Sequence, residues 1–203
     1  MYPMISTSLK PAVTRVINPV ARALLKIGAT ANGVTFVGAA CLILSALYFL
    51  PKGQFFAGCM SITFFTLSDL FDGAMARIST QGASRWGGFL DSTLDRVADM
   101  AILAGVILHL NKSRDALVPV VLASLVLGFL VSYIRAKAES LDIECSGGVA
   151  ERTERLVIAL TAIGLHGLQV PFALALGMWG LAILAAVTVA QRLIIVRNAV
   201  ASE

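Results

Sequence analysis

Charged residues are scarce in this sequence, and their scarcity excludes most soluble folds. Of the 203 residues, 14% are Asp, Glu, Lys or Arg, whereas 58% are hydrophobic. A soluble domain usually carries about 25% charged residues. A disordered chain is excluded as well, because such chains are rich in charge and poor in apolar residues. We therefore predict an integral membrane protein, and we expect no nucleic-acid partner.

Cysteine is also scarce. The three cysteines are too few for the disulfide framework that holds many small secreted proteins together. Cys41 and Cys59 lie within apolar runs, so we expect both to be buried as small hydrophobic side chains. The two histidines, His109 and His166, should lie toward the outer side, away from the acidic clusters, and are expected to be packing or interface residues.

Long stretches without charge indicate the membrane spans. A helix needs about 20 apolar residues to cross a bilayer, whereas β-barrel strands would alternate apolar and polar residues. The longest stretch, residues 156–191, is interrupted by Gly167 and Pro171 and therefore predicts two spans. We predict an all-α integral membrane protein, a single domain over residues 1–203, in which residues 32–197 form a bundle of six transmembrane helices at 32–51, 54–79, 87–110, 115–141, 152–168 and 172–197.

Lys and Arg are distributed unevenly between the two sides of these spans. Six spans place both termini on one side, and that side collects all but three of the 16 Lys and Arg residues. The exceptions are Lys52, Lys112 and Arg114. Because positive charge is enriched in cytoplasmic loops, we expect a multi-pass protein with both termini in the cytoplasm.

The first 27 residues are basic and amphipathic. Charges run through them, so a cleaved signal peptide is not expected. Pro11 suits the first turn of a helix, and Pro19 should kink or split it. The apolar face would hold Val13, Ile17, Val20, Leu24 and Ile27, opposite Arg15, Arg22 and Lys26. We predict an N-terminal amphipathic interfacial helix within residues 1–27, on the cytoplasmic leaflet; a simple basic flank of the first span is the alternative.

Four aspartates occupy two short segments with helical spacing. Asp69 and Asp72 are separated by one helical turn, as are Asp91 and Asp95, so each pair shares a helix face. A short polar connection joins the two helices and should bring both pairs together near the cytoplasmic surface. Ionisable residues in membrane helices are costly and usually mark functional sites. Salt bridges with nearby arginines are the structural alternative, and Asp99 could be a supporting partner or a buried structural carboxyl.

These carboxylates offer hard oxygen ligands without a nearby His or Cys cluster. Such sites suit Mg²⁺ or Mn²⁺ rather than Zn²⁺. Two facing pairs can hold two ions about 4 Å apart, an arrangement used for displacement at phosphorus. Gly73 and Gly87 leave space for a phosphate-bearing ligand, and Arg77 could pair with a phosphate. We predict two Mg²⁺ ions, with Mn²⁺ as a substitute, held by Asp69, Asp72, Asp91 and Asp95.

The spacing Asp69-x2-Asp72-Gly73-x2-Ala76-Arg77-x9-Gly87-x3-Asp91-x3-Asp95 resembles the signature of the CDP-alcohol phosphotransferase family, whose six-span plan also fits. The resemblance implies that an alcohol attacks the lipid-side phosphate of a CDP-linked lipid and that CMP leaves. It implies a general base at Asp95, which also matches a metal contact. The residues implied to bind CDP-diacylglycerol are Asn32, Gly33, Val34, Thr35, Gly73, Arg77 and Ser84. Asn32 could equally be the N-cap of the first span.

Basic residues gather at the cytoplasmic ends of the last three spans. Arg135, Arg155 and Arg192 could converge beside the aspartates, and such guanidinium groups suit an acceptor that carries phosphate. Flanking positive charge is the structural alternative. The segments resemble those of actinobacterial family members whose acceptor is inositol 1-phosphate. That resemblance implies that these three arginines hold the inositol phosphate, with Arg152 or Lys137 as lesser candidates.

We therefore expect transfer of a phosphatidyl group from CDP-diacylglycerol to a hydroxyl of inositol 1-phosphate, with release of CMP. Glycerol 3-phosphate is the rival acceptor, which would make the protein a phosphatidylglycerophosphate synthase. An ion-coupled transporter is the alternative from another class, although its site would usually lie near the membrane midplane. The resemblance also implies a homodimer in the cell membrane of a prokaryote, with a cytoplasmic active site.

Overall fold

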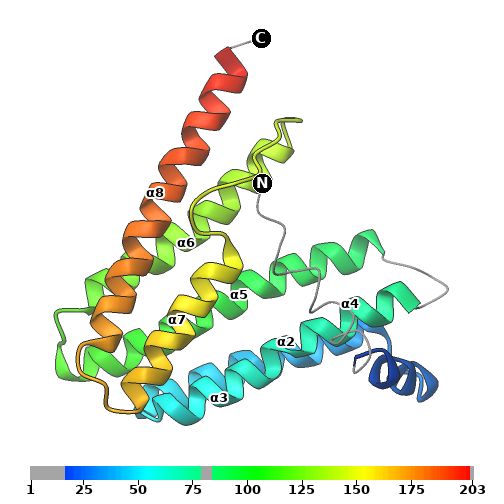
Figure 1. Ribbon diagram of the computed structural model, residues 1–203, viewed down its shortest axis with the longest axis horizontal. Coiled ribbons are helices and arrows are strands. Elements are labelled where there is room, and N and C mark those ends of the chain that lie inside the picture. The colour runs from blue at the N-terminus through cyan, green and yellow to red at the C-terminus, as the bar shows by residue number, and fades with distance from the viewer. Residues whose placement is uncertain (1–16, 79–83, 202–203) are drawn as a thin grey trace, which may run out of the picture. The chain divides into compact units, whose positions relative to one another are not determined.

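The structure is a computed structural model that describes residues 17–78 and 84–201, with the backbone alone for Ser68 and Asp69. These residues form helices joined by loops, with no strand among them, which confirms the predicted all-α class. Figure 1 shows the helices α2 (Ala31–Phe49), α3 (Phe55–Thr66), α4 (Ser68–Ile78), α5 (Arg85–Leu110), α6 (Val118–Glu139), α7 (Arg152–Gly167) and α8 (Ala173–Ala201), with short 3-10 helices at Leu50–Lys52 and Asn111–Ser113.

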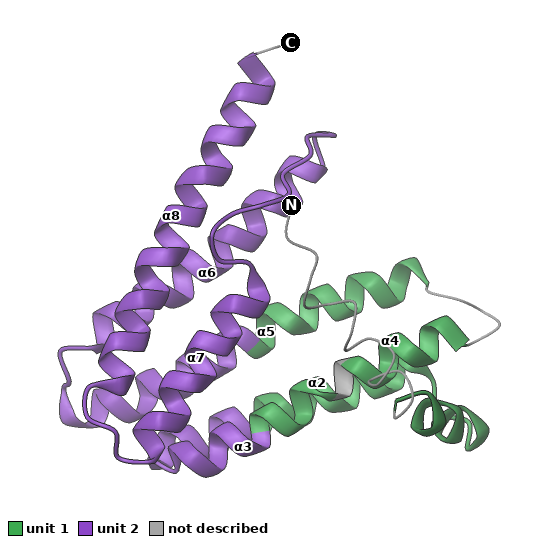
Figure 2. Ribbon diagram, in the orientation of Figure 1, with its two compact units in different colours: residues 1–44, 62–98 green, residues 45–61, 99–203 purple. Residues whose placement is uncertain are grey.

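Two compact units make up the fold, as coloured in Figure 2. The first unit comprises residues 1–44 and 62–98, apart from those outside the described part of the chain. It holds α4, the first part of α5 and the N-terminal part of α2. The second unit comprises residues 45–61 and 99–203, again within the described part, and holds α6, α7 and α8. All four predicted metal ligands thus belong to the first unit, and the three predicted acceptor arginines belong to the second.

The helical residues 17–26 of the first unit pack against α4. Ile17 and Ala21 form a buried cluster with Ala74 and Met75. Leu24 of the predicted apolar face also packs against this cluster, but Val20 and Ile27 are exposed. Part of the predicted apolar face therefore packs against α4. Pro19 lies within the helical stretch 17–26, and the predicted residues Pro11, Val13 and Arg15 lie outside the described residues.

The second predicted span, residues 54–79, is two helices in the structure. The break falls at Leu67, between α3 and α4. Ser68 and Asp69 follow immediately, and such short polar residues favour helix starts over helix interiors because their side chains compete for backbone hydrogen bonds. The predicted span at 54–79 thus matches the candidate span Phe55–Ile78, but the break at Leu67 makes the first aspartate pair begin a helix of its own.

Helices α6, α7 and α8 pack together in the second unit (Figure 1). The Ser124 hydroxyl of α6 lies 3.2 Å from the Met178 carbonyl oxygen of α8 and can donate to it. Gly177 of α8 lies against Ala162 of α7, where a side chain would collide. Small residues at such contacts let membrane helices approach closely.

The three connections predicted on the outer side belong to this unit. Lys112 donates a 2.6 Å hydrogen bond to the Pro51 carbonyl oxygen, so two of these connections touch. The ring of Phe55 lies between the rings of His109 and His166, with centroids 4.8 and 4.7 Å away. Both histidines thus take part in aromatic packing, as the sequence predicted.

Within residues 17–78 and 84–201, four helical segments are long and apolar enough to cross a membrane: Ala31–Lys52, Phe55–Ile78, Val118–Glu139 and Ala173–Ala201. Large apolar side chains on them, such as Leu44, Phe64 and Leu176, are exposed, as a lipid-facing surface requires. Two predicted spans do not meet this standard. Helix α5 carries several charges in its first half, and α7 has 16 residues, about 24 Å at 1.5 Å per residue. The structure thus supports a membrane protein with four candidate spans.

Candidate active site

Asp72 of α4 is held by a residue of α2. Its side chain is 8% exposed, and its Oδ2 accepts a hydrogen bond from the Thr35 hydroxyl at 2.5 Å. Asp91 of α5 lies near enough for its carboxylate to repel that of Asp72. The structure therefore brings one member of each predicted aspartate pair together within the first unit.

Of the other two aspartates, the structure describes the side chain of Asp95 but not that of Asp69. Asp95, one turn beyond Asp91 on α5, has a side chain 17% exposed and lies 3.5 Å from the Arg96 guanidinium. This contact is one of the salt bridges that the sequence left open, but it involves a neighbouring residue and leaves the carboxylate partly accessible. Asp69 lies in the first turn of α4, and its side chain is outside the described residues.

The first turn of α2 is capped by Thr30. The backbone N–H of Gly33 donates to the Thr30 hydroxyl at 3.1 Å, which is the N-cap arrangement. The prediction of Asn32 as a possible cap was therefore wrong, and the Asn32 amide faces α5 instead. A Cβ built at Gly87 would lie 2.7 Å from Asn32 Oδ1. Asn32 and the signature glycine thus adjoin each other, as a shared nucleotide site requires.

Ser84 begins α5. Its hydroxyl accepts a 2.9 Å hydrogen bond from the Gly87 N–H, so it is the N-cap of this helix. On α4 the Arg77 side chain turns back over Gly73, with Nη1 3.6 Å from the position that a Cβ on this glycine would take. These contacts place the predicted CDP residues at the ends and small-residue faces of the helices that carry the aspartates.

The candidate metal ligands in the first unit are carboxylate oxygens. Asp72, Asp91 and Asp95 offer carboxylates, and no His or Cys among the described residues joins them. Within those residues no group of three His, Cys, Asp or Glu side chains is close enough to hold a metal ion, and Asp69 is not among them. Hard oxygen donors of this kind fit Mg²⁺ or Mn²⁺. A divalent cation bound between neighbouring carboxylates would also offset their mutual repulsion.

Two of the predicted acceptor arginines are buried in the second unit. Arg192 of α8 is 3% exposed and donates from Nε to the Gly147 carbonyl oxygen at 3.0 Å and from Nη1 to that of Val131 at 2.5 Å. Arg155 of α7 is 8% exposed and donates to the Ala150 carbonyl oxygen at 2.9 Å. Both arginines therefore contact the loop between α6 and α7, and the structure brings them to the same segment.

The third arginine differs. Arg135, near the end of α6, is exposed and forms a 2.8 Å ion pair with Glu139 one turn later. Such an exposed pair is worth at most about 1 kcal/mol, so the Arg135 side chain can leave it at little cost. Arg152, a lesser candidate, lies 3.4 Å from the carboxylate of Asp99. Asp99 thus forms an ion pair between α5 and α7.

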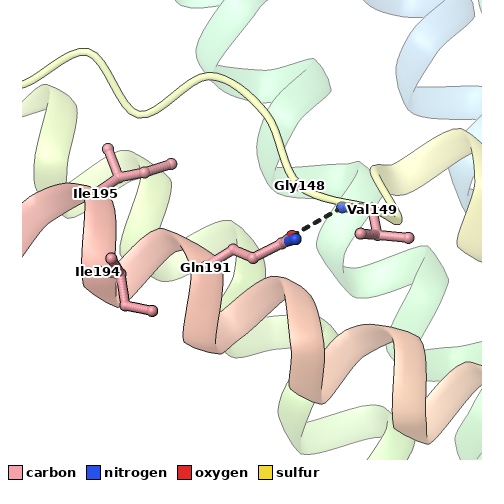
Figure 3. Close-up of a pocket in the computed structure, with 5 residues that line it drawn as sticks. All are labelled: Gly148, Val149, Gln191, Ile194 and Ile195. Carbon is pink, nitrogen blue, oxygen red and sulfur yellow. Dashed lines mark hydrogen bonds between the residues drawn. The ribbon is translucent and has the colours of Figure 1, made fainter.

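The loop before α7 is also held by polar residues of α8 that the sequence analysis did not single out. The backbone N–H of Ala150 donates to the Thr188 hydroxyl at 3.2 Å, and that of Val149 donates to Gln191 Oε1 at 3.1 Å (Figure 3). Thr188, Gln191 and Arg192 are spaced at three and four residues, so they form one polar stripe on an apolar helix. This polar stripe on an apolar helix is the sequence pattern that could have indicated the contact between α8 and the loop.

A groove of about 420 Å³ lies beside this contact. Figure 3 shows the residues that line it: Gly148, Val149, Gln191, Ile194 and Ile195. Gly148 has φ +132°, and a Cβ there would lie 2.5 Å from Thr188 Cγ2. Only glycine allows the loop to approach α8 this closely in that backbone conformation. The groove therefore lies where the loop before α7 packs closely against α8.

Residues 29–191 match the family profile described as CDP-alcohol phosphatidyltransferase, and this range contains all the aspartates discussed above. The chain belongs to the CDP-alcohol phosphatidyltransferase family. It is an enzyme of this class, and the resemblance predicted from the aspartate spacing is confirmed.

Curated relatives in this family are similar over nearly their whole length. The phosphatidylinositol phosphate synthase of Streptomyces avermitilis is 41% identical, with 96% of this chain and 83% of the relative covered. That of Mycobacterium tuberculosis is 39% identical, with 91% and 87% covered. The crystal structure of the M. tuberculosis enzyme with CDP-DAG bound matches with a TM-score of 0.86 and 41% identity, over 90% of this chain and 94% of that one. Its complex with manganese and citrate matches with a TM-score of 0.84 and 39% identity, over 89% and 88%.

The close contact at Gly87 gives a first prediction. In the Gly87→Ala variant the new methyl group must displace Asn32 Oδ1 or Ser84 Oγ, which would lie 2.7 and 3.0 Å from it. We expect phosphatidyl transfer to fall at least about tenfold, because loss of the cap alone costs about 1 kcal/mol and the Asn32 amide also moves. Initial rates of CMP release measure the effect.

Gly88→Ala is the matched control for this variant. A Cβ at Gly88 meets no heavy atom within 4 Å, so Ala should leave the rate unchanged and stabilise α5 slightly. Equal rates for the two variants would show that the contact between Asn32 and Gly87 has no part in catalysis.

Proposed function

We propose that this protein is a phosphatidylinositol phosphate synthase, which transfers the phosphatidyl group of CDP-diacylglycerol to a hydroxyl of inositol 1-phosphate and releases CMP. The observation that carries the proposal is the similarity to curated enzymes of that name, at 39–41% identity over more than 90% of this chain. A transporter, the alternative from another class, is not supported by membership of a transferase family.

The proposed metal site comprises Asp69, Asp72, Asp91 and Asp95, with two Mg²⁺ ions or Mn²⁺ in their place. The oxygen-only donor set and the repulsion between Asp72 and Asp91 support it. A related crystal structure contains manganese. Bound divalent cations would supply electrostatic stabilisation for the charge that develops on the phosphates and on the leaving CMP.

The chain's own residues have distinct proposed roles. Asp95 is the general base that accepts the proton of the attacking hydroxyl, and its partial exposure leaves it reachable by a substrate. Asn32, Gly33 and Val34 at the start of α2, with Gly73, Arg77 and Ser84, form the proposed CDP site. Gly73 lets the nucleotide approach the α4 backbone, and the Arg77 guanidinium beside it can pair with a phosphate.

The proposed acceptor site comprises Arg135, Arg155 and Arg192. Burial of the last two in the second unit supports a built site rather than simple flanking charge, because flanking residues are solvated. Arg135 supplies a charge that can be redirected, since only an exposed ion pair holds it. A cluster of guanidinium groups selects an acceptor that carries a phosphate.

We further propose six membrane spans, including α5 and α7, with both termini and the active site in the cytoplasm of a prokaryotic cell. The charged residues of α5 end at Asp99, so residues 100–110 are apolar enough to enter the bilayer. The basic residues of α6, α7 and α8 lie near the ends that this topology places inside. The proposal includes residues 1–203 as a single domain, an interfacial helix within residues 1–27, and a homodimer.

Transfer of label from CDP-diacylglycerol to a panel of acceptors tests the function. With the purified enzyme and Mg²⁺, we expect inositol 1-phosphate to give labelled lipid at least about tenfold faster than glycerol 3-phosphate, because the arginine geometry is proposed to fit the inositol ring as well as the phosphate. Serine and free inositol should be poorer still. Chelation of the metal should abolish transfer, and added Mg²⁺ or Mn²⁺ should restore it. Preference for glycerol 3-phosphate would instead identify a phosphatidylglycerophosphate synthase.

A further inference from the structure

Thr35 and Asp72 are joined across two helices. They are 37 residues apart, on the first turns of α2 and in the middle of α4, and each is 8% exposed. The distance of 2.5 Å between Thr35 Oγ1 and Asp72 Oδ2 is a direct hydrogen bond. Because both side chains are buried, water does not compete for this bond as it would at the surface.

The Thr35 hydroxyl is fully engaged as a donor. Besides Asp72, it lies 3.1 Å from the Ala31 carbonyl oxygen one turn earlier. A hydroxyl has one proton, and carbonyl and carboxylate oxygens only accept, so both partners compete for that proton. None is left to donate to a nucleotide. The resemblance implied that Thr35 contacts CDP-diacylglycerol, and these two hydrogen-bond partners give its hydroxyl a different role as a donor.

The packing around this pair fixes its geometry. Ala31 and Val34, which flank Thr35 on α2, pack against the buried cluster that contains Ala74 and Met75 of α4. Thr is also β-branched, so its side chain has few alternative rotamers in a helix. The hydroxyl is therefore held in place at the carboxylate from the α2 side.

We infer that Thr35 is a positioning residue that orients the Asp72 carboxylate for metal binding. The inference rests on the proposed function, in which Asp72 is a metal ligand. Hydrogen bonds to a ligating carboxylate fix its orientation, and loss of such a partner typically weakens metal binding by 10- to 100-fold. Thr35 acts on the reaction through Asp72 and not through the nucleotide.

Binding of Mn²⁺ alone to the purified full chain tests the inference, with free Mn²⁺ followed by electron paramagnetic resonance. Thr35→Val keeps the shape and removes the hydroxyl, so its Kd for Mn²⁺ should rise at least tenfold. Thr35→Ser keeps the hydroxyl and should restore binding to within about threefold of the original chain. At saturating metal, the KM for CDP-diacylglycerol should change less than threefold in both variants.

Thr66→Val is the matched control. Thr66 also donates to the carbonyl oxygen one turn earlier, that of Ile62, at 2.9 Å. This variant loses the same kind of backbone contact in the same unit, so its Kd for Mn²⁺ should not change. If Thr35→Val does not fold, Thr35→Ala removes the hydroxyl with less bulk and is measured in the same way.

Two results would overturn the inference. Unchanged Mn²⁺ binding in Thr35→Val, with a raised KM for CDP-diacylglycerol, would make Thr35 a nucleotide contact. Equal weakening in Thr35→Val and Thr66→Val would make the effect one of helix stability. The proposed function fails separately: it fails if Asp72→Asn binds Mn²⁺ normally, or if the original chain binds Mn²⁺ but does not use inositol 1-phosphate.

Discussion

Replacement of Asp95 by Asn should abolish turnover while CDP-diacylglycerol still binds. Asn has nearly the same shape and can still accept a hydrogen bond from Arg96, which lies 3.5 Å from the Asp95 carboxylate. It cannot accept a proton from the attacking hydroxyl at neutral pH. General bases contribute about 10²–10⁴-fold to rates, so kcat should fall by at least about 100-fold.

The measurement combines CMP release with binding of labelled CDP-diacylglycerol to the purified enzyme. The Kd for the lipid should stay within about threefold, since the residues proposed to bind CDP are untouched. Asp142→Asn is the matched control, because Asp142 is exposed in the loop after α6 and has φ +57°, a conformation that Asn adopts as readily as Asp. Near-normal turnover in Asp95→Asn would refute the base role.

The sequence predicted the helices well wherever their apolar runs ended at strong signals. For α7 the prediction was 152–168 against an observed Arg152–Gly167, since charged residues begin the helix and a Gly and Pro segment follows it. It failed at Leu67, where an apolar residue lies at the break and only the weak preference of Ser68 and Asp69 indicated a new helix. Hydrophobicity alone does not distinguish one membrane helix from two that follow directly.

The aspartate site was predictable in its residue types but not in its contacts. Helical spacing indicated that each pair shares a face, and the family follows from that spacing. The bond from Thr35 to Asp72 could not be predicted, because it depends on how α2 and α4 pack across 37 residues of sequence. Likewise Asn32 could be assigned as a cap from its type, yet Thr30, two residues earlier, is the cap.

The hydrogen-bond partners of the arginines could not be predicted from the sequence, for a different reason. The sequence suggested Arg135, Arg155 and Arg192 as an acceptor site, with flanking charge as the alternative, and the structure shows Arg155 and Arg192 to be buried. Both arginines donate to backbone carbonyl oxygens, at Ala150, Gly147 and Val131. Every residue carries such an acceptor, so no side-chain pattern could have indicated which ones these guanidinium groups contact.

Replacement of Arg192 by Gln should lower stability and weaken binding of the acceptor at the same time. The variant removes the hydrogen bonds from the guanidinium to the carbonyl oxygens of Gly147 and Val131, at about 1.5–3 kcal/mol each. Among the described residues, the two hydrogen bonds use two of the five guanidinium N–H groups. In the proposed acceptor site the other N–H groups bind the acceptor phosphate, so the KM for inositol 1-phosphate should rise at least about tenfold, whereas that for CDP-diacylglycerol should change less than threefold.

Thermal unfolding and initial rates, both recorded well below the unfolding midpoint of the variant, separate the two effects. Arg197→Gln is the matched control, because Arg197 lies on the same helix and is exposed; it should change neither quantity. A lower midpoint with an unchanged KM for inositol 1-phosphate would assign Arg192 to the loop alone and remove it from the acceptor site. A raised KM with a similar rise for glycerol 3-phosphate would show that Arg192 recognises the phosphate, and that selection of the inositol ring depends on other residues of this unit.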